Sequence, residues 1–152
     1  MISNTKTEKI ILALILCLAA FSPPDIASGA ERYAVSGAIA NIRSGPGTDF
    51  DVIWKVERYY PVAVLEKKGK WYKIEDFEGD KGWVHNSLLN KTKTVVVKKK
   101  DCNVRSGPGT DFPVVFQAKQ GVPFRCLNSK GPWINIQHDD GDAGWIHSSL
   151  TW

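Results

Sequence analysis

The sequence contains few of the residues on which enzymes most often build a catalytic site. It has three cysteines and three histidines in 152 residues, and its acidic residues show no metal-ligand spacing. Catalytic zinc needs three protein ligands close together, and a serine hydrolase needs a third residue and an oxyanion site beside its serine and histidine. No glycine-rich loop opens a helix as a phosphate cradle. We therefore predict a protein that is not an enzyme and holds no metal or cofactor.

Long apolar stretches are also scarce, and the one that stands out lies near the N-terminus. Two lysines precede the apolar run 10–21, and Ser28-Gly-Ala30 follows it. A basic start, a short apolar run and a small-residue ending are typical of a secretory signal peptide, whereas a membrane span needs about 20 apolar residues. We predict cleavage after Ala30, with Ala27 as the alternative. The protein would then be secreted or periplasmic without a membrane span, an uncleaved anchor being the other interpretation.

Charge of one sign is in only mild excess. The formal net charge is +4, and much of the excess lies in the lysines between residues 91 and 100. Nucleic-acid binders spread basic residues over a face, so this localised pattern gives no ground for expecting nucleic acid as a partner. A short basic stretch is typical of a solvated linker or an edge strand, and it also fits attraction to an anionic surface.

What the sequence does contain is one segment written twice. Residues 41–88 return as residues 103–150 at a constant offset of 62 positions, and 23 of the 48 aligned positions are identical. Because internal repeats set the domain count, we predict a signal peptide at 1–30, a first domain at 31–91 and a second domain at 92–152.

Each repeat consists of short apolar or alternating runs separated by Gly, Pro and Asp clusters, as is typical of β-strands. No apolar face at helical spacing extends over a useful length. Five or so short strands in about 60 residues predict an all-β fold, a small antiparallel barrel or sandwich in each repeat. The runs 33–35 and 94–97 are the expected first strands of the two domains, and the clearest other strand runs are 62–65, 71–74 and 81–84 with their counterparts 124–127, 133–136 and 143–146.

Three motifs together resemble the bacterial SH3-like domain family. They are the string Asn-(Ile/Val)-Arg-Ser-Gly-Pro-Gly-Thr-Asp-Phe at 41–50 and 103–112, a central Gly-x-Trp at 69–71 and 131–133, and a closing Gly-Trp-(Val/Ile)-His-x-Ser-Leu at 82–88 and 144–150. The resemblance covers nearly all of the chain after residue 30. It implies two tandem small, partly open SH3-like β-barrels of five to seven strands, of the kind that targets bacterial cell walls beside a separate catalytic domain.

The first motif suggests candidates for ligand contact. Asn41 and Arg43 occupy alternate strand positions and so point the same way. Their first expected role is to hydrogen-bond the loop carbonyls that the Gly45-Pro-Gly47 turn exposes, the glycines of this turn permitting positive φ, while Thr48 and Asp49 cap the loop. In the resembled family this loop forms one wall of a peptide groove. The candidates, including the aromatic platform, are Asn41, Arg43, Thr48, Asp49, Trp71 and Tyr72 in the first copy and Asn103, Arg105, Thr110, Asp111 and Trp133 in the second.

Other residues of the repeat are interpreted as structural. Trp83 and Trp145 follow a glycine in a strand and are expected in the core. His85 and His147 are expected to bond loop carbonyls, and the serine two positions after each is expected to act as an N-cap. The terminal Trp152 is expected to dock onto the second barrel.

Two cysteines remain after the predicted cleavage site, and both fall in the second repeat. Cys102 and Cys126 correspond to Ala40 and Val64 in the first. A small apolar pair in one copy suggests two interior positions that face each other, and exported proteins meet oxidising conditions. We predict a structural disulfide, with two buried free thiols as the alternative. Because both cysteines would be paired, a cysteine-peptidase site is not expected.

Three functions follow as hypotheses. The first is recognition of peptidoglycan, through its stem peptide or cross-bridge. The second is a periplasmic adaptor that binds an extended segment of an envelope protein along a strand edge or aromatic groove. The third is a wall hydrolase or regulator, against which the missing nucleophile counts. The ligand, the copy that binds it and the oligomeric state stay open.

Overall fold

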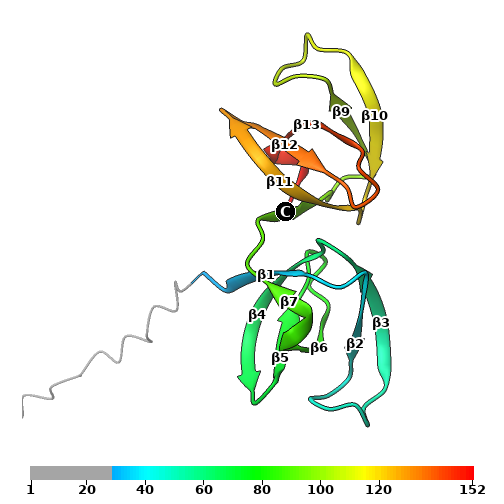
Figure 1. Cartoon of the computed structure of the whole chain (residues 1–152), viewed down its shortest axis with the longest axis vertical. Helices are drawn as coiled ribbons and strands as arrows, with labels where there is room; N and C mark the ends of the chain where they lie inside the picture. The colour runs from blue at the N-terminus through cyan, green and yellow to red at the C-terminus, as the bar shows by residue number, and fades with distance from the viewer. Residues whose placement is uncertain (1–28) are drawn as a thin grey trace, which may run out of the picture.

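The computed structural model describes residues 29–152, so the predicted signal peptide lies, but for its last two residues, outside the described part. The described chain is all-β and forms two sheets of seven and six strands, stacked along the long axis of the molecule (Figure 1). Two short 3-10 turns are the only helices among residues 29–152. None of the described helices is long and apolar enough to cross a membrane.

The first sheet comprises β1 (Glu31–Val35), β2 (Ile39–Arg43), β3 (Val52–Glu57), β4 (Pro61–Lys68), β5 (Trp71–Glu75), β6 (Lys81–His85) and β7 (Leu89–Asn90), with η1 (Asn86–Leu88) between the last two. The second comprises β8 (Thr94–Val96), β9 (Asp101–Arg105), β10 (Val114–Lys119), β11 (Pro123–Lys130), β12 (Trp133–Gln137) and β13 (Ala143–His147), followed by η2 (Ser148–Leu150).

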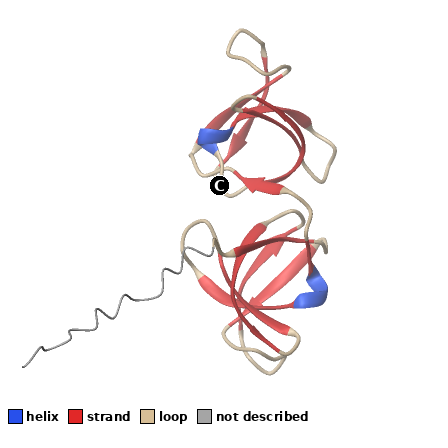
Figure 2. Ribbon diagram, turned by 90° about the vertical axis from the view of Figure 1, so that its left-hand side faces the viewer, coloured by secondary structure: helices blue, strands red, loops and turns tan. Residues whose placement is uncertain are grey.

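The two sheets share one topology. The strand order is β3-β2-β6-β5-β4-β1-β7 in the first and β10-β9-β13-β12-β11-β8 in the second, and every pair is antiparallel. The long strands β4 and β11 shift register at matching places, between Val64 and Glu66 and between Cys126 and Asn128. Such bulges bend a strand, and both sheets curl (Figure 2). The prediction of two small, partly open all-β domains is confirmed.

Strand alternation decides which residues form the two cores. Ile42, Ile74 and Val84 are fully buried in the first core, and residues at the same positions of the repeat fill the second. Gly82 and Val84 of β6 point inward, so Trp83 between them lies on the other face and is only half-buried. The same holds for Trp145 in β13. The expectation that these two tryptophans belong to the core is therefore wrong.

Strand β8, which belongs to the second sheet, and the residue that follows it contribute to both cores. Val95 and Val97 pack in the second core, whereas Val96 between them is fully buried in the first. Val96 also exchanges backbone hydrogen bonds with Trp152, at 3.1 and 2.9 Å. The Trp152 side chain packs against the first core, not the second as expected, and the Arg32 guanidinium lies 3.8 Å from the centre of its ring. The chain end therefore ties the two domains together (Figure 1).

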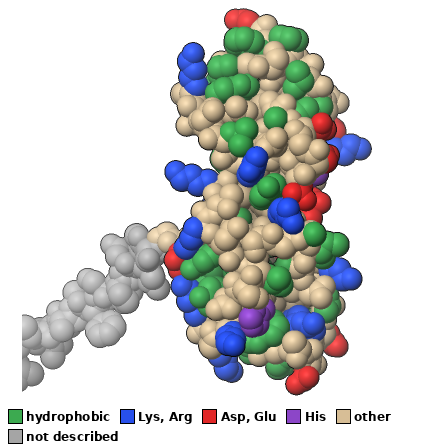
Figure 3. Space-filling model, viewed as in Figure 1, with side chains coloured by type: hydrophobic (Ala, Val, Ile, Leu, Met, Phe, Trp, Pro, Cys, Tyr) green, Lys and Arg blue, Asp and Glu red, His purple; other side chains and the backbone are tan. Residues whose placement is uncertain are grey.

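A surface ion pair adds to this joint. Arg58 of the first domain donates a hydrogen bond to the carboxylate of Asp139 of the second at 3.2 Å. Both side chains are exposed, so the pair contributes about 0–1 kcal/mol. Elsewhere on the face in Figure 3, basic and acidic side chains are interspersed over both domains.

The start of β1 is held by an exposed charged cluster. The Glu31 carboxylate accepts hydrogen bonds from Lys67, at 2.7 Å, and from Lys91. These bonds, that of Lys67 first, lower the pKa of Glu31 to about 2. Tyr33 lies beneath the two lysines, with the Lys91 ammonium 3.6 Å from the centre of its ring. The cluster thus joins β1 to β4 and to the segment that leads into the second domain.

The predicted disulfide is wrong, because both cysteines are free thiols. Cys102 lies in β9 and Cys126 in β11, and two strands, β13 and β12, separate them in the sheet. The Cys102 thiol donates a weak hydrogen bond to the Lys99 carbonyl oxygen, 3.8 Å away, in the segment just before β9. Cys126 lies at the joint, where it lines a hollow with Arg32 and Lys93. Burial raises the pKa of both thiols.

Candidate functional site

The first domain carries a small groove lined by four of the residues that were predicted from the sequence to contact a ligand. Asn41 and Arg43 come from β2, Thr48 from the following loop and Trp71 from β5, and together with His85 and Leu88 they enclose about 180 Å³. Trp71 and His85 are directly opposite in the β5–β6 ladder. Their rings meet edge to face, 5.4 Å apart at 88°. The groove therefore has a polar wall along β2 and an aromatic wall across from it.

Arg43 holds the loop that forms one end of this groove. Its Nη1 donates to the carbonyl oxygens of Thr48, at 3.0 Å, and Phe50, at 2.8 Å. This is the structural role expected for the arginine. Gly45 and Gly47 do not have positive φ, contrary to expectation. Gly45 is needed because the Phe50 ring lies where a Cβ would stand. Among the described residues, neither Thr48 nor Asp49 makes the predicted side-chain cap.

The histidine of the closing motif caps the 3-10 turn that follows it. His85 Nδ1 accepts a hydrogen bond from the Ser87 backbone N–H at 3.3 Å and lies 2.7 Å from the Ser87 hydroxyl oxygen. His147 and Ser149 repeat this arrangement, with 3.3 and 2.8 Å. The histidine, and not the serine as predicted, is therefore the N-cap. This capping fixes the orientation of the imidazole ring that meets the tryptophan ring.

The second domain carries the same groove in a larger form. Asn103, Arg105, Thr110 and Trp133 line a hollow of about 350 Å³. Trp133 and His147 meet as their counterparts do, 5.3 Å apart at 90°. Arg105 again donates to the loop, to the Phe112 carbonyl at 2.8 Å. The remaining lining residues, which the sequence did not nominate, are Asp101, Cys102, His147, Ser149 and Leu150.

Three nominated residues do not line these grooves. Tyr72 follows Trp71 directly in β5, and successive strand residues point to opposite faces. Its ring lies edge-on to Tyr33, with ring centres 5.9 Å apart, and packs against the first core. Asp49 and Asp111 sit in the exposed loops but outside the groove walls.

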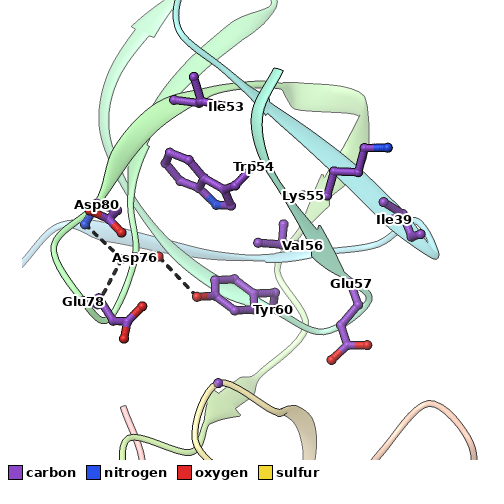
Figure 4. Close-up of a pocket in the computed structure, with 11 residues that line it drawn as sticks. Ile39, Ile53, Trp54, Lys55, Val56, Glu57, Tyr60, Asp76, Glu78 and Asp80 are labelled. Atoms are coloured by element: carbon purple, nitrogen blue, oxygen red, sulfur yellow. Dashed lines mark hydrogen bonds between the residues drawn. The ribbon is translucent and has the colours of Figure 1, made fainter. Parts of the chain in front are cut away.

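A different cleft, about 600 Å³, is larger than either groove (Figure 4). Trp54 and Tyr60 form its aromatic part, and Asp76, Glu78 and Asp80 form an acidic edge. The Asp76 carboxylate is buried and accepts hydrogen bonds from the Glu78 and Asp80 backbone N–H groups, at 2.9 and 3.0 Å. It also accepts one from the Tyr60 hydroxyl at 3.3 Å.

These bonds make Asp76 a turn-forming residue. Burial, and then the charge of Asp76, raises the pKa of Tyr60. Carboxylate oxygens of the three acidic residues lie within 4.8 Å of one another, a grouping that the sequence analysis missed although the residues alternate along the chain. The matching cleft of the second domain, about 290 Å³, has Val122 and His138 in place of Tyr60 and Asp76. The contents of this cleft therefore differ between the copies, whereas those of the grooves are retained.

Comparison with known sequences identifies the domains. The sequence model described as "Bacterial SH3 domain" matches residues 36–91 and 98–152. The chain belongs to this family.

Several curated proteins are similar to the chain over part of their length. A Bacillus subtilis protein named as an N-acetylmuramoyl-L-alanine amidase is 29% identical over 160 residues, which cover 97% of this chain and 31% of that protein. A Staphylococcus epidermidis protein named as a cell wall amidase is 37% identical over 55 residues, 34% of this chain and 19% of that protein. A Listeria monocytogenes protein named as the endopeptidase p60 is 27% identical, over 95% of this chain and 28% of that protein. The chain thus spans less than a third of each of these relatives.

A solved structure, an NlpC/P60 family protein from Bacillus cereus, also resembles the chain. It is 13% identical over 80% of this chain and 56% of that chain, with a TM-score of 0.39. A likeness at this level supports no argument about function.

Proposed function

We propose that this chain is a non-catalytic, exported binding module that recognises the peptide part of a cell-wall polymer through its paired grooves. One observation carries the proposal: an Asn, an Arg, a Thr, a Trp and a His line the same groove in both repeats. The cleft of Trp54 and Tyr60 and its counterpart in the second domain, by contrast, differ in their lining. The relatives named as wall amidases and an endopeptidase support cell-wall peptidoglycan as the partner. Two of these matches cover nearly all of this chain, including both of its bacterial SH3 domains.

The chemistry of the groove suits a peptide. An indole and an imidazole ring offer flat apolar surface, and the asparagine amide offers both donors and an acceptor to a peptide group. The guanidinium adds charged donors at one end. Each histidine lies within hydrogen-bond distance of the serine two positions on, and in both pairs the same nitrogen caps the 3-10 turn. Within residues 29–152 no acidic side chain is hydrogen-bonded to either of these two imidazoles, so neither pair has the third member that a serine hydrolase needs. Binding without chemistry is the activity that these side chains support.

A second candidate is an adaptor for an envelope protein, and the sheet edges favour it. β3 and β10 end their sheets and leave one side of each strand unpaired. Each edge starts with two exposed apolar residues, Val52 and Ile53 in β3 and Val114 and Val115 in β10. An extended partner segment could add to such an edge by main-chain hydrogen bonds.

The first experiment is co-sedimentation of residues 31–152 with isolated peptidoglycan sacculi at low and high salt. Pelleting that resists high salt is expected, because groove contacts are not screened as exposed charges are. Trp71→Ala combined with Trp133→Ala should weaken pelleting by tenfold or more, as loss of about 2 kcal/mol at an aromatic anchor requires. Leu65→Ala, at an exposed residue outside the grooves, is the control and should pellet as the unaltered protein does.

Three results would count against the proposal. Pelleting that disappears at high salt and is unaffected by the two Trp→Ala changes would assign attachment to the basic stretch, and no pelleting would favour the adaptor. Release of soluble wall fragments would show that the chain is catalytic. Thermal melts of each variant keep a loss of binding separate from a loss of fold.

A further inference from the structure

We infer that the groove of the second domain is the principal ligand site, and that it takes an extended peptide with an ammonium group at one end and a carboxylate at the other. The inference rests on the proposed function and adds which copy binds and by what charges. It follows from three differences between two otherwise equivalent grooves.

The first difference is a polar row along β9. Asp101, Asn103 and Arg105 occupy alternate positions of one strand, so their side chains lie on one face, and all three line the groove. At about 3.3 Å per residue, the row is about 13 Å long between the Cα atoms of Asp101 and Arg105. In β2 the first of these positions is Ile39, which is 63% exposed and lines the larger cleft instead. Only the second groove of the described chain therefore has opposite charges at its two ends.

The second difference concerns the arginine. Arg43 uses its Nη1 to bond two loop carbonyls, whereas within the described residues Arg105 bonds one, that of Phe112. A guanidinium has five N–H donors in a planar fork that suits a carboxylate. Arg105 thus keeps more of its donors for a ligand, at the end of the row opposite Asp101.

The third difference is room and orientation. The second groove encloses about 350 Å³ against about 180 Å³ in the first. The Asn103 side-chain oxygen accepts a hydrogen bond from Gln117 at 3.1 Å. This bond fixes the amide in the middle of the row and leaves its N–H groups for a peptide carbonyl. The Trp133 indole forms the facing wall, so an extended chain is held between amide and ring.

These features define the occupant by charge complementarity. A row of about 13 Å matches four extended residues at about 3.3 Å each. The ammonium group, from a terminus or a side chain, would lie at Asp101 and the carboxylate at Arg105. A uniformly charged segment would leave one end of the row unpaired, and a neutral segment would leave both ends unpaired.

The test uses tetraalanine, its N-acetylated form and its C-terminal amide, titrated into residues 31–152 and followed by indole and amide NMR shifts. Tetraalanine should shift Trp133 and leave Trp71 nearly unchanged. Acetylation and amidation should each weaken binding by about tenfold, as loss of a charge-assisted hydrogen bond requires. Asp101→Asn should abolish the penalty of acetylation, and Arg105→Gln should abolish that of amidation.

Leu127→Ala, at an exposed residue of the second domain outside the groove, is the control and should leave tetraalanine binding unchanged. In Arg105→Gln, loss of a ligand contact should weaken only the peptides with a free carboxylate, whereas loss of loop support would weaken all three peptides equally. Equal shifts of Trp71 and Trp133, or equal affinity for the three peptides, would overturn the inference. If sacculi still pellet the protein in that case, the proposed function survives; if sacculi do not pellet it, the proposed function fails as well.

Discussion

Gly144 of β13 is a position where a single added methyl group should cost the second domain stability. A Cβ there would lie 2.7 Å from Val104 Cγ1, 2.8 Å from the Arg105 carbonyl oxygen and 3.2 Å from Val115 Cγ2. Val104 is fully buried and the carbonyl belongs to the backbone, so neither can rotate away. Strands β13 and β9 must move apart, and overpacking of this kind costs about 1–3 kcal/mol.

A Gly→Ala change also restricts the unfolded chain, which by itself stabilises by about 0.4–1 kcal/mol. Gly109→Ala in the same domain is therefore the control. Its nearest contact would be the exposed Phe112 ring at 3.3 Å, which can move outward. The free energy of unfolding should differ between the two variants by about 1–3 kcal/mol, or a Tm difference of roughly 4–24 °C for a domain of this size. Denaturant unfolding followed by circular dichroism measures it. Equal midpoints for the two variants would refute the reasoning, because then β13 and β9 separate without cost.

Three further predictions follow from the joint and the free thiols. The pKa of Glu31 falls from 4.5 to about 2 on folding, so its contribution to stability is present above about pH 4.5 and is lost as the pH falls toward 2. Glu31→Gln should therefore reduce the change of the urea midpoint with pH across that window, and an unchanged dependence of the midpoint on pH would contradict this. Val96→Ala should cost about 1.5–3 kcal/mol and speed amide hydrogen exchange in the first sheet as well as the second, whereas faster exchange confined to the second would show that Val96 does not support the first core. Thiol titration of the unfolded, unreduced protein should detect both Cys102 and Cys126, and a reductant should leave the Tm unchanged. A Tm that falls on adding reductant, by the amount expected from losing about 3 kcal/mol, would instead show that the two cysteines form a disulfide.

The fold was predictable because two copies of one pattern constrain it. Alternating runs bounded by glycine turns specify short antiparallel strands, and the repeat offset pairs every core position with a counterpart. The role of Arg43 was predictable for a similar reason, because the residue stands two positions after Asn41, just before a turn with exposed carbonyls. Local pattern is enough for features that adjacent residues decide.

The failures are of two kinds: some could have been avoided from strand alternation alone, and others depend on neighbours in space. Trp71 and Tyr72 cannot share a face, and strand phase alone would have removed Tyr72 from the groove. Cys102 and Cys126 were both predicted to be interior, but the repeat does not reveal that two strands stand between them. Trp152 has no counterpart within the repeat, so nothing in the sequence indicated that it packs on the first core. The Asp101 position was within reach, because it continues the alternation of Asn103 and Arg105.

The contact between Arg32 and Trp152 brings the start of the first strand and the end of the chain to one place (Figure 1). A linker of a few residues would join them, and new ends could be opened in the exposed segment 91–93 between the two repeats. The order of the repeats along the polypeptide is thus independent of their arrangement in space. A circular permutant with the second repeat first would present both grooves in their present positions, which makes the tandem suitable for insertion as a single cassette into a loop of another protein.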